Sequence, residues 1–237
     1  MIRRLNAPDF WRISKKEYEY VAKPIPGPHP GDNCFTIIYF LRDLLKVARS
    51  AVEVKKILNN GGVLVDGKAR KDMHFPLGLM DIVEIPAIGK TFRMMPDAMY
   101  NLKPVEVTKD KEYKLCKIIN KKSMVGGHIQ LNLHDGRSII IKVKDPAKPK
   151  EDVYKTNDVV QIDLKSGKIA DHIKFEKGKL AIVHAGINNG RKGKITKITS
   201  IIKNDVATLD EGGIEFETKM EYVFVLGDDK PVIAVGL

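Results

Sequence analysis

Three basic residues at helical spacing are the first side chains in this sequence with an evident chemistry. Arg42, Lys46 and Arg49 fall at positions i, i+4 and i+7 of a segment whose apolar residues also recur with a helical period. A helix would place these three cations in one stripe on its surface. Such a stripe either binds phosphate groups or simply faces solvent, and the spacing alone leaves both readings open.

The stripe belongs to the first of two predicted helices. The apolar residues of 37–48 define the first helix. The second begins at Ser50, because the segment Ser50–Glu53 fits a capping box in which both end residues bind free amides of the first turn. We expect this helix to end at Gly61-Gly62, with Lys55 and Lys56 off its apolar side.

A predicted hairpin follows the helices. Val63–Val65 leads into Asp66-Gly67, a pair that favours a tight turn with positive backbone angles, and the chain returns through Lys68–Arg70. Residues 80–85 then alternate between apolar and polar side chains, as a half-buried strand does. We therefore predict a helix-helix-hairpin module over residues 32–90.

A second cluster of chemistry-bearing residues is a glycine-rich loop with basic residues at its exit. Glycine can adopt positive backbone angles and allows close approach of another backbone, and the cations could bind phosphate. The alternative is an ordinary glycine-rich β turn. The loop glycines are Gly186, Gly190 and Gly193, and the basic residues are Arg191, Lys192 and Lys194.

The first 31 residues combine basic and aromatic side chains with a proline-rich stretch over 24–30, which must be extended. We expect residues 1–31 to form an arm that binds RNA by charge and by base stacking, although a tether packed on its own domain is the alternative. The candidate residues are Arg3, Arg4, Trp11, Lys15 and Lys16, with Tyr18 and Tyr20 as further aromatics.

Short strands with regular turn signals dominate the rest of the chain. The segments 113–119, 129–134, 138–143 and 159–164 have strand patterns, with turns at Asp-Gly and Ser-Gly pairs. We predict a central β-rich domain over residues 91–172 and a second β domain over 173–237. The fold class is therefore an α+β multidomain protein.

Composition limits the function. The 237 residues carry a formal net charge of +11 and 43% are hydrophobic, so the chain can bury a core and is expected to bind a polyanion. A basic surface kept only for solubility is the alternative. The apolar run from Ile37 stops at Arg42, and no apolar stretch follows Arg3 and Arg4, so we expect neither a membrane span nor a signal peptide. The two cysteines stand apart, and we expect buried, reduced thiols.

The helical module resembles the RNA-binding module named after bacterial small-subunit ribosomal protein four, through Arg49-Ser50 and the segment from Gly61 to Lys68. This resemblance implies a basic surface that docks on structured RNA. Residues 175–195 are similar to the KOW motif, which implies a small SH3-like barrel. The implied module contacts are Arg42, Lys46, Arg49, Lys55, Lys56, Lys68 and Arg70.

The combination of these motifs resembles the archaeal and eukaryotic (e-type) family of small-subunit ribosomal protein four from about residue 3 to 230, with supporting segments such as Tyr113–Lys117 and Gln130–Gly136. The resemblance implies a structural constituent of the cytoplasmic small ribosomal subunit. Its implied partners are ribosomal RNA and neighbouring ribosomal proteins, and we expect a monomer away from the ribosome.

Other functional classes fit less well. Pseudouridine synthases and RNA methyltransferases share the RNA-docking module, but no alternating strand and long-helix pattern follows residue 91. His128 and His134 could share a strand face, yet a third metal ligand at usable spacing is missing. We therefore expect no enzyme activity, cofactor, metal or small-molecule substrate. A KOW-containing transcription elongation or antitermination factor that binds RNA polymerase stays open as the alternative function.

Overall fold

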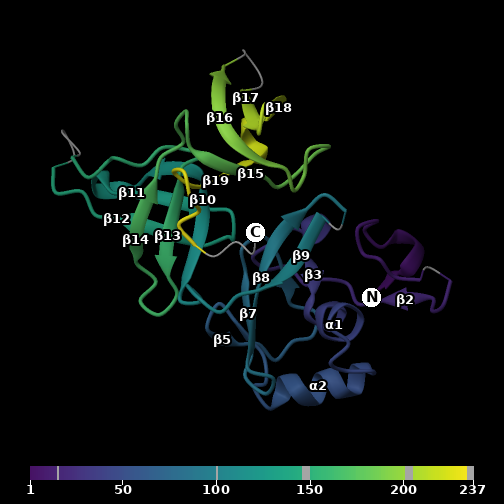
Figure 1. The fold of residues 1–237 in the computed structure, drawn as a ribbon. Coiled ribbons are helices and arrows are strands. Elements are labelled where there is room, and N and C mark those ends of the chain that lie inside the picture. The colour runs from purple at the N-terminus through teal and green to yellow at the C-terminus, as the bar shows by residue number, and fades with distance from the viewer. Residues whose placement is uncertain (15, 100, 146–149, 201–204, 234–237) are drawn as a thin grey trace. The chain divides into compact units, whose positions relative to one another are not determined.

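The computed structural model describes residues 1–14, 16–99, 101–145, 150–200 and 205–233. Most regular structure in these residues is β-strand, with only a few short helices. The chain divides into two compact units, one spanning Met1–Glu112 and a second that begins at Tyr113 (Figure 1). The β-rich multidomain character that the sequence predicts is present, but helices contribute less than an α+β class suggests.

The first predicted helix is shorter than its apolar pattern. It consists of α1 (Ile37–Tyr39) and a π-helical segment, η3 (Phe40–Leu44). The Leu45 amide donates to the Phe40 carbonyl at 2.9 Å, five residues back, and Lys46 then adopts a left-handed backbone with φ of 56°. Because the wide π turn and the reversal at Lys46 interrupt the helical period, the predicted stripe of three cations does not form.

The second predicted helix, α2 (Ala51–Asn59), has the expected cap. The Ser50 hydroxyl accepts from the Glu53 amide at 3.2 Å, and the Glu53 carboxylate accepts from the Arg49 amide at 2.7 Å. Gly61, with φ of 70°, follows the end of the helix, as expected for a glycine at that position. The helix buries Val54 and Leu58.

The hairpin and the following strands form one five-stranded sheet in the first unit, in the order β5-β4-β7-β8-β9. Asp66 and Gly67 have φ of 50° and 73°, which confirms the predicted tight turn. The domain boundary expected near residue 91 falls inside this sheet, because β8 and β9 pair with β7 and with each other. The strands are β4 (Leu64–Val65), β5 (Lys68–Ala69), β7 (Ile82–Ile85), β8 (Lys90–Asp97) and β9 (Asn101–Glu106).

The N-terminal segment is packed into the first unit and does not form a separate arm. Trp11 is 1% exposed; its indole N–H donates to the Cys34 carbonyl at 2.9 Å and its ring stacks on Tyr39 at 5.2 Å. The buried His29 ring lies 3.0 Å from both carboxylate oxygens of Asp81. The short elements here are β1 (Ile2–Arg3), η1 (Arg4–Asn6), β2 (Tyr20–Val21), η2 (Gly31–Asn33), β3 (Phe35–Thr36) and β6 (Pro76–Leu77).

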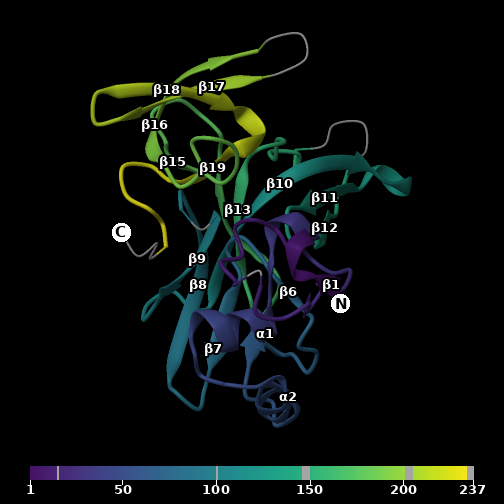
Figure 2. The ribbon, with the colours of Figure 1, turned by 90° about the vertical axis from the view of Figure 1, so that its right-hand side faces the viewer.

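The second unit contains the central strands that the sequence predicts, in a sheet of order β12-β11-β10-β13-β14. The first half of β10 pairs with β13 and its second half with β11 (Figure 2). The pairing with β11 is irregular between Ile118 and Asn120. Apolar side chains such as Leu131 and Ile162 form the core. The strands are β10 (Tyr113–Ser123), β11 (Ile129–Leu133), β12 (Ser138–Ile141), β13 (Val159–Asp163) and β14 (Ile169–Ile173), and η4 (Val125–Gly127) joins β10 to β11.

A second sheet of this unit has the order β18-β17-β16-β15-β19. Strand β15 lies between β16 and β19, so the last strand of the chain returns beside the first strand of this sheet. Its strands are β15 (Leu180–Val183), β16 (Lys192–Thr199), β17 (Val206–Glu211), β18 (Ile214–Lys219) and β19 (Val223–Gly227), and the short helix η5 (Met220–Tyr222) precedes β19.

Candidate nucleic-acid interface

Helix α2 and the segment after β5 bring basic side chains together in the first unit. Lys55, Lys71 and His74 line a hollow of about 380 Å³. Lys55, Lys56 and Lys71 are all exposed, and we call these three lysines the α2 basic cluster. Sequence reasoning missed Lys71, although its position directly after Arg70 on the return of the hairpin was a usable signal.

The other predicted residues of this module differ in how available they are. Lys46, Arg49 and Lys68 are exposed. Arg42 is half-buried and pairs with its neighbour Asp43 at 2.9 Å. The guanidinium of Arg70 lies 4.3 Å from the centre of the Phe75 ring, also half-buried. Arg42 and Arg70 therefore have internal partners that compete with RNA.

The N-terminal candidates separate into surface and core residues. Arg3 and Lys16 line a hollow of about 440 Å³ together with Tyr18, whose side chain is 69% exposed. Arg4 is buried, where its guanidinium donates to the Ser14 carbonyl and lies 5.1 Å from the centre of the Tyr18 ring.

Two of the RNA contacts predicted in this segment are wrong, because the side chains are buried. Arg4 and Trp11 are 3% and 1% exposed, so both serve the core of the unit and neither presents a free surface to RNA. Tyr18 and Tyr20, 69% and 48% exposed, are the aromatic rings of this segment that reach the surface. The predicted contact Lys15 lies outside the described residues.

The glycine-rich loop between β15 and β16 has the backbone that its sequence predicts. Gly186 and Gly190 have φ of 80° and 81°, where a side chain is disfavoured. Gly193 has a different role, since an added Cβ would lie 2.6 Å from the Asp210 carbonyl oxygen on β17. All three glycines are thus required by backbone geometry.

We expect Gly193→Ala to lower the free energy of unfolding by about 1–3 kcal/mol, because the methyl group would push β16 away from β17. Chemical denaturation followed by circular dichroism measures the loss. Gly167→Ala is the informative comparison: its φ of 69° is strained but nothing lies within 4 Å of the new methyl group, so only the backbone cost should appear. Equal stability of Gly193→Ala and the native protein would contradict the close approach.

The cations at the exit of this loop are largely engaged within the protein. Arg191 donates to the Glu211 carboxylate at 2.8 Å and its guanidinium lies 3.9 Å from the centre of the Phe216 ring. Lys194 pairs with Asp229 at 2.6 Å. Burial lowers the pKa of the half-buried Lys192, against the opposing influence of Glu211. These three residues are weaker candidates for RNA contact than the α2 basic cluster.

A hollow of about 540 Å³ in the second unit is lined by Lys117, His134 and His184, among others. The Lys117 ammonium donates to three carbonyl oxygens, those of Met220 at 3.2 Å and of Glu221 and Val223 at 2.8 Å. Burial lowers the pKa of Lys117 to about 7, and the Glu221 carboxylate opposes this shift. Because a neutral amine has only two hydrogens to donate, the three carbonyls favour the charged form.

His184 gives this hollow a predictable response to acid. Burial and the charge of Lys117 lower its pKa to about 4 from an ordinary value of 6.5, although the Glu221 carbonyl raises it. Between pH 4 and pH 6.5, the unfolded chain therefore binds a proton at His184 that the folded chain does not bind. We expect the free energy of unfolding to fall by about 1–2 kcal/mol as the pH drops from 6.5 to 4. This energy is smaller than the full pKa shift would give, because the His184 ring is partly exposed to solvent.

The measurement is denaturant unfolding of the native protein and of His184→Gln across this pH range. Glutamine does not titrate and keeps a donor for the Glu221 carbonyl, so the variant should lose this part of the pH dependence. Identical pH profiles for the two proteins would contradict the assignment to His184.

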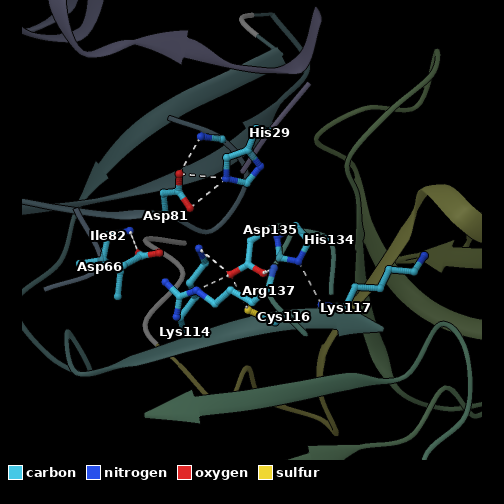
Figure 3. A network of polar contacts seen from close by, with 11 residues as sticks. His29, Asp66, Asp81, Ile82, Lys114, Cys116, Lys117, His134, Asp135 and Arg137 are labelled. Carbon is cyan, nitrogen blue, oxygen red and sulfur yellow. Dashed lines mark hydrogen bonds and ion pairs between the residues drawn. The ribbon is translucent and has the colours of Figure 1, made fainter. Parts of the chain in front are cut away.

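A cluster of charged side chains, the buried Lys114 and Asp135 and the half-buried Arg137, lies in the second unit (Figure 3). Lys114 and Asp135 have side chains that are 0% and 1% exposed, with 3.3 Å between ammonium and carboxylate, and Arg137 reaches the same carboxylate at 3.1 Å. Burial raises the pKa of Asp135, but the charges of Lys114, His134 and Arg137 outweigh it and hold the pKa below its usual range. Asp135 is therefore charged at neutral pH.

The described residues contain no group of three or more His, Cys, Asp or Glu side chains that could hold a metal ion. The two histidines considered from sequence each bind a backbone amide instead, His128 that of Val143 and His134 that of Lys117, both at 3.2 Å. Within the described part of the chain, no helix has the length and apolar character to cross a membrane.

Comparisons with known proteins extend over almost the whole chain. Residues 88–169 match the family model described as ribosomal family S4e, and residues 2–32 match the RS4NT (NUC023) domain. The small ribosomal subunit protein eS4 of Methanocaldococcus jannaschii is 44% identical over 234 residues, which are 98% of this chain and 96% of that protein. The eS4 protein of Staphylothermus marinus is 42% identical over 236 residues, 98% of this chain and 94% of that protein.

A solved structure agrees with this similarity. The crystal structure of the 30S ribosomal protein S4e from Thermoplasma acidophilum is 32% identical to this chain, with a TM-score of 0.70. The match covers 84% of this chain and 97% of that one.

Proposed function

The chain belongs to the ribosomal S4e family, and we propose from this premise that it is a structural constituent of the small ribosomal subunit that binds ribosomal RNA. The observation that carries the proposal is the similarity to small-subunit eS4 proteins over 98% of the chain. The protein then works in the ribosome, in the cytoplasm. Neighbouring ribosomal proteins are further partners, and we infer a monomer away from the ribosome.

The proposed mechanism is positioning, without bond-making chemistry. Lysine and arginine side chains on folded units neutralise RNA phosphates and release counterions, which drives binding and fixes orientation. The net charge of +11 supports this mechanism. We propose that the protein is not an enzyme and takes no small-molecule substrate.

The contacts we propose are the predicted basic residues that are exposed, apart from Lys194, which pairs with Asp229, together with Lys71. Those with internal partners, such as Arg42 and Arg191, contribute less because RNA must compete with a carboxylate already in place. The proposed contact residues are Arg3, Lys16, Lys46, Arg49, Lys55, Lys56, Lys68 and Lys71.

We also propose three finer points of the domain organisation. The capped helix α2 and the tight Asp66-Gly67 turn support a module over residues 32–90 like that of bacterial small-subunit ribosomal protein four. The glycine-rich loop between β15 and β16 supports a KOW-type SH3-like barrel over residues 173–237. The pairing of β8 and β9 with β7 argues that a central β domain starts near residue 113 instead of 91.

Sedimentation tests the function. Tagged protein expressed in cells should co-sediment with small subunits in a sucrose gradient at moderate salt and should crosslink to small-subunit ribosomal RNA. Absence from that fraction, with recovery beside RNA polymerase, would instead favour the transcription-factor alternative. The relatives named above are small-subunit proteins and lend that alternative no support.

A further inference from the structure

One face of the sheet β12-β11-β10-β13-β14 carries mainly uncharged polar side chains over its first three strands. Cross-strand pairing aligns Lys122, Gln130 and Ile140 in one row across β10, β11 and β12. It aligns Asn120, Asn132 and Ser138 in the next row. Directly paired residues point to the same side of a sheet, so these six side chains form one face, which we call the amide face.

The amide face points away from the core of its unit. Leu131, between the two rows on β11, points to the opposite side and is fully buried there. Asn120, Lys122, Ser138 and Ile140 are exposed, Ile140 to 53%. The Gln130 amide donates to the Asn132 side-chain oxygen at 2.7 Å, as expected for residues two apart on one strand face.

The chemistry of this face excludes most kinds of partner. Its six residues include no acidic side chain to attract a basic protein, and no aromatic ring on which an unpaired base could stack. A single isoleucine is too little apolar surface for the core of a protein–protein interface. A single lysine is too few cations for a surface that recognises RNA through phosphates alone.

What the face offers is three primary amides and a hydroxyl, which can donate and accept hydrogen bonds. The side-chain oxygens of Asn120 and Asn132 each already accept one bond, from the Lys121 amide and the Gln130 side chain, and each keeps a second lone pair and the N–H donors for a ligand. The shallow, wide minor groove of an A-form RNA helix presents ribose 2′-hydroxyls and base edges, which need donors and acceptors of this kind. We propose that the amide face docks in the minor groove of a double-helical segment of ribosomal RNA. This inference rests on the proposed ribosomal function and names the groove that one surface recognises.

Directed hydroxyl-radical probing tests the proposal in assembled subunits. Ile140→Cys places a thiol at the β12 edge of the face, next to Gln130, for attachment of an iron chelate that cuts nearby riboses. The two native thiols do not interfere, because Cys34 and Cys116 are both buried. Ile214→Cys is the matched control, since Ile214 is also an exposed isoleucine, 65% accessible, on strand β18 of the other sheet.

We expect the probe at Ile140→Cys to cut both strands of one RNA helix, with each set of cuts displaced toward the 3′ side, as for cleavage across a minor groove. The control should not reproduce these cuts. If the labelled variant enters small subunits but cuts no helix, or cuts only one strand, the proposal is overturned while the ribosomal function stands. If the labelled and native proteins both fail to enter subunits, the proposed function itself is overturned.

A second measurement separates groove recognition from phosphate contact. Changing Asn120, Gln130 and Asn132 together to Ala should weaken binding to small-subunit ribosomal RNA about ten- to hundredfold. The dependence of affinity on salt should not change, because neutral amides release no counterions. Lys122→Ala should instead make the salt dependence shallower. A shallower salt dependence for the amide variant, or unchanged affinity, would overturn the proposal, with circular dichroism confirming that the sheet is intact.

Discussion

Replacing Asp135 with alanine is expected to lower the free energy of unfolding by about 3–5 kcal/mol. The substitution removes the carboxylate 3.3 Å from the Lys114 ammonium, whose side chain is 0% exposed. Removing the carboxylate beside a buried ammonium is far more costly than keeping the pair intact, because water has little access to take its place. Urea unfolding followed by circular dichroism measures the loss.

Two control variants decide whether the buried charge is the cause. The double variant Lys114→Met with Asp135→Leu removes both charges and should be much less destabilised than Asp135→Ala. Arg137→Ala removes the partner whose side chain is 35% exposed and should cost about 1 kcal/mol or less. If the double variant is as unstable as the single one, the lost packing rather than the buried ammonium explains the effect.

Removing the α2 basic cluster is expected to have the largest effect on RNA binding. With Lys55, Lys56 and Lys71 changed together to Ala, the plot of log affinity against log salt should become shallower by about 2–3, at roughly 0.7–0.9 for each phosphate no longer neutralised. Filter binding to small-subunit ribosomal RNA over a series of salt concentrations measures this slope.

The matched control removes the same amount of charge from cations that already have a carboxylate partner. Arg42 pairs with Asp43, Lys90 with Glu106 and Lys194 with Asp229. Changing these three basic residues to Ala should alter the slope much less. Equal changes in the two variants would mean that only net charge matters and that the α2 basic cluster is an ordinary solvated surface.

Local sequence signals were sufficient where the structure depends on neighbouring residues. The Asp66-Gly67 turn follows from the backbone angles that these two residues tolerate, and the Ser50 cap from a hydrogen bond three residues away. The central strands were also predictable, because their alternating side chains match a sheet with one buried face. These features need no information from distant parts of the chain.

The predictions of RNA-contact residues were wrong where residues distant in the sequence bury or pair the side chain. The basic and aromatic composition around Trp11 fits an RNA-binding arm equally well, and the contacts that hold the ring in the core come from Cys34 and Tyr39, which are distant in the sequence. Likewise, Arg191 lacks an acidic neighbour in sequence, and its partner Glu211 comes from a different strand. A basic residue is thus easy to find in a sequence, but whether it is available for RNA depends on the tertiary fold.

The prediction of one continuous α-helix over residues 37–48 was wrong for a related reason. Its apolar period continues to Ala48, yet the π turn ends at Leu44 and Lys46 reverses the chain. Ala48 is still buried, so the periodic pattern correctly identified a core residue while misassigning the backbone that carries it. Periodicity reports which side chains are buried more reliably than the helix type that buries them.

The three carbonyl partners of Lys117 have a consequence for the order of events during synthesis. They belong to Met220, Glu221 and Val223, more than a hundred residues later in the chain. At about 5–20 residues per second, the nascent protein carries this lysine without its partners for roughly 5–20 s. The strands of the central sheet can therefore pair before the three carbonyl partners of Lys117 have been synthesised. A chain released before Met220 has its central sheet but leaves the Lys117 ammonium without these three partners.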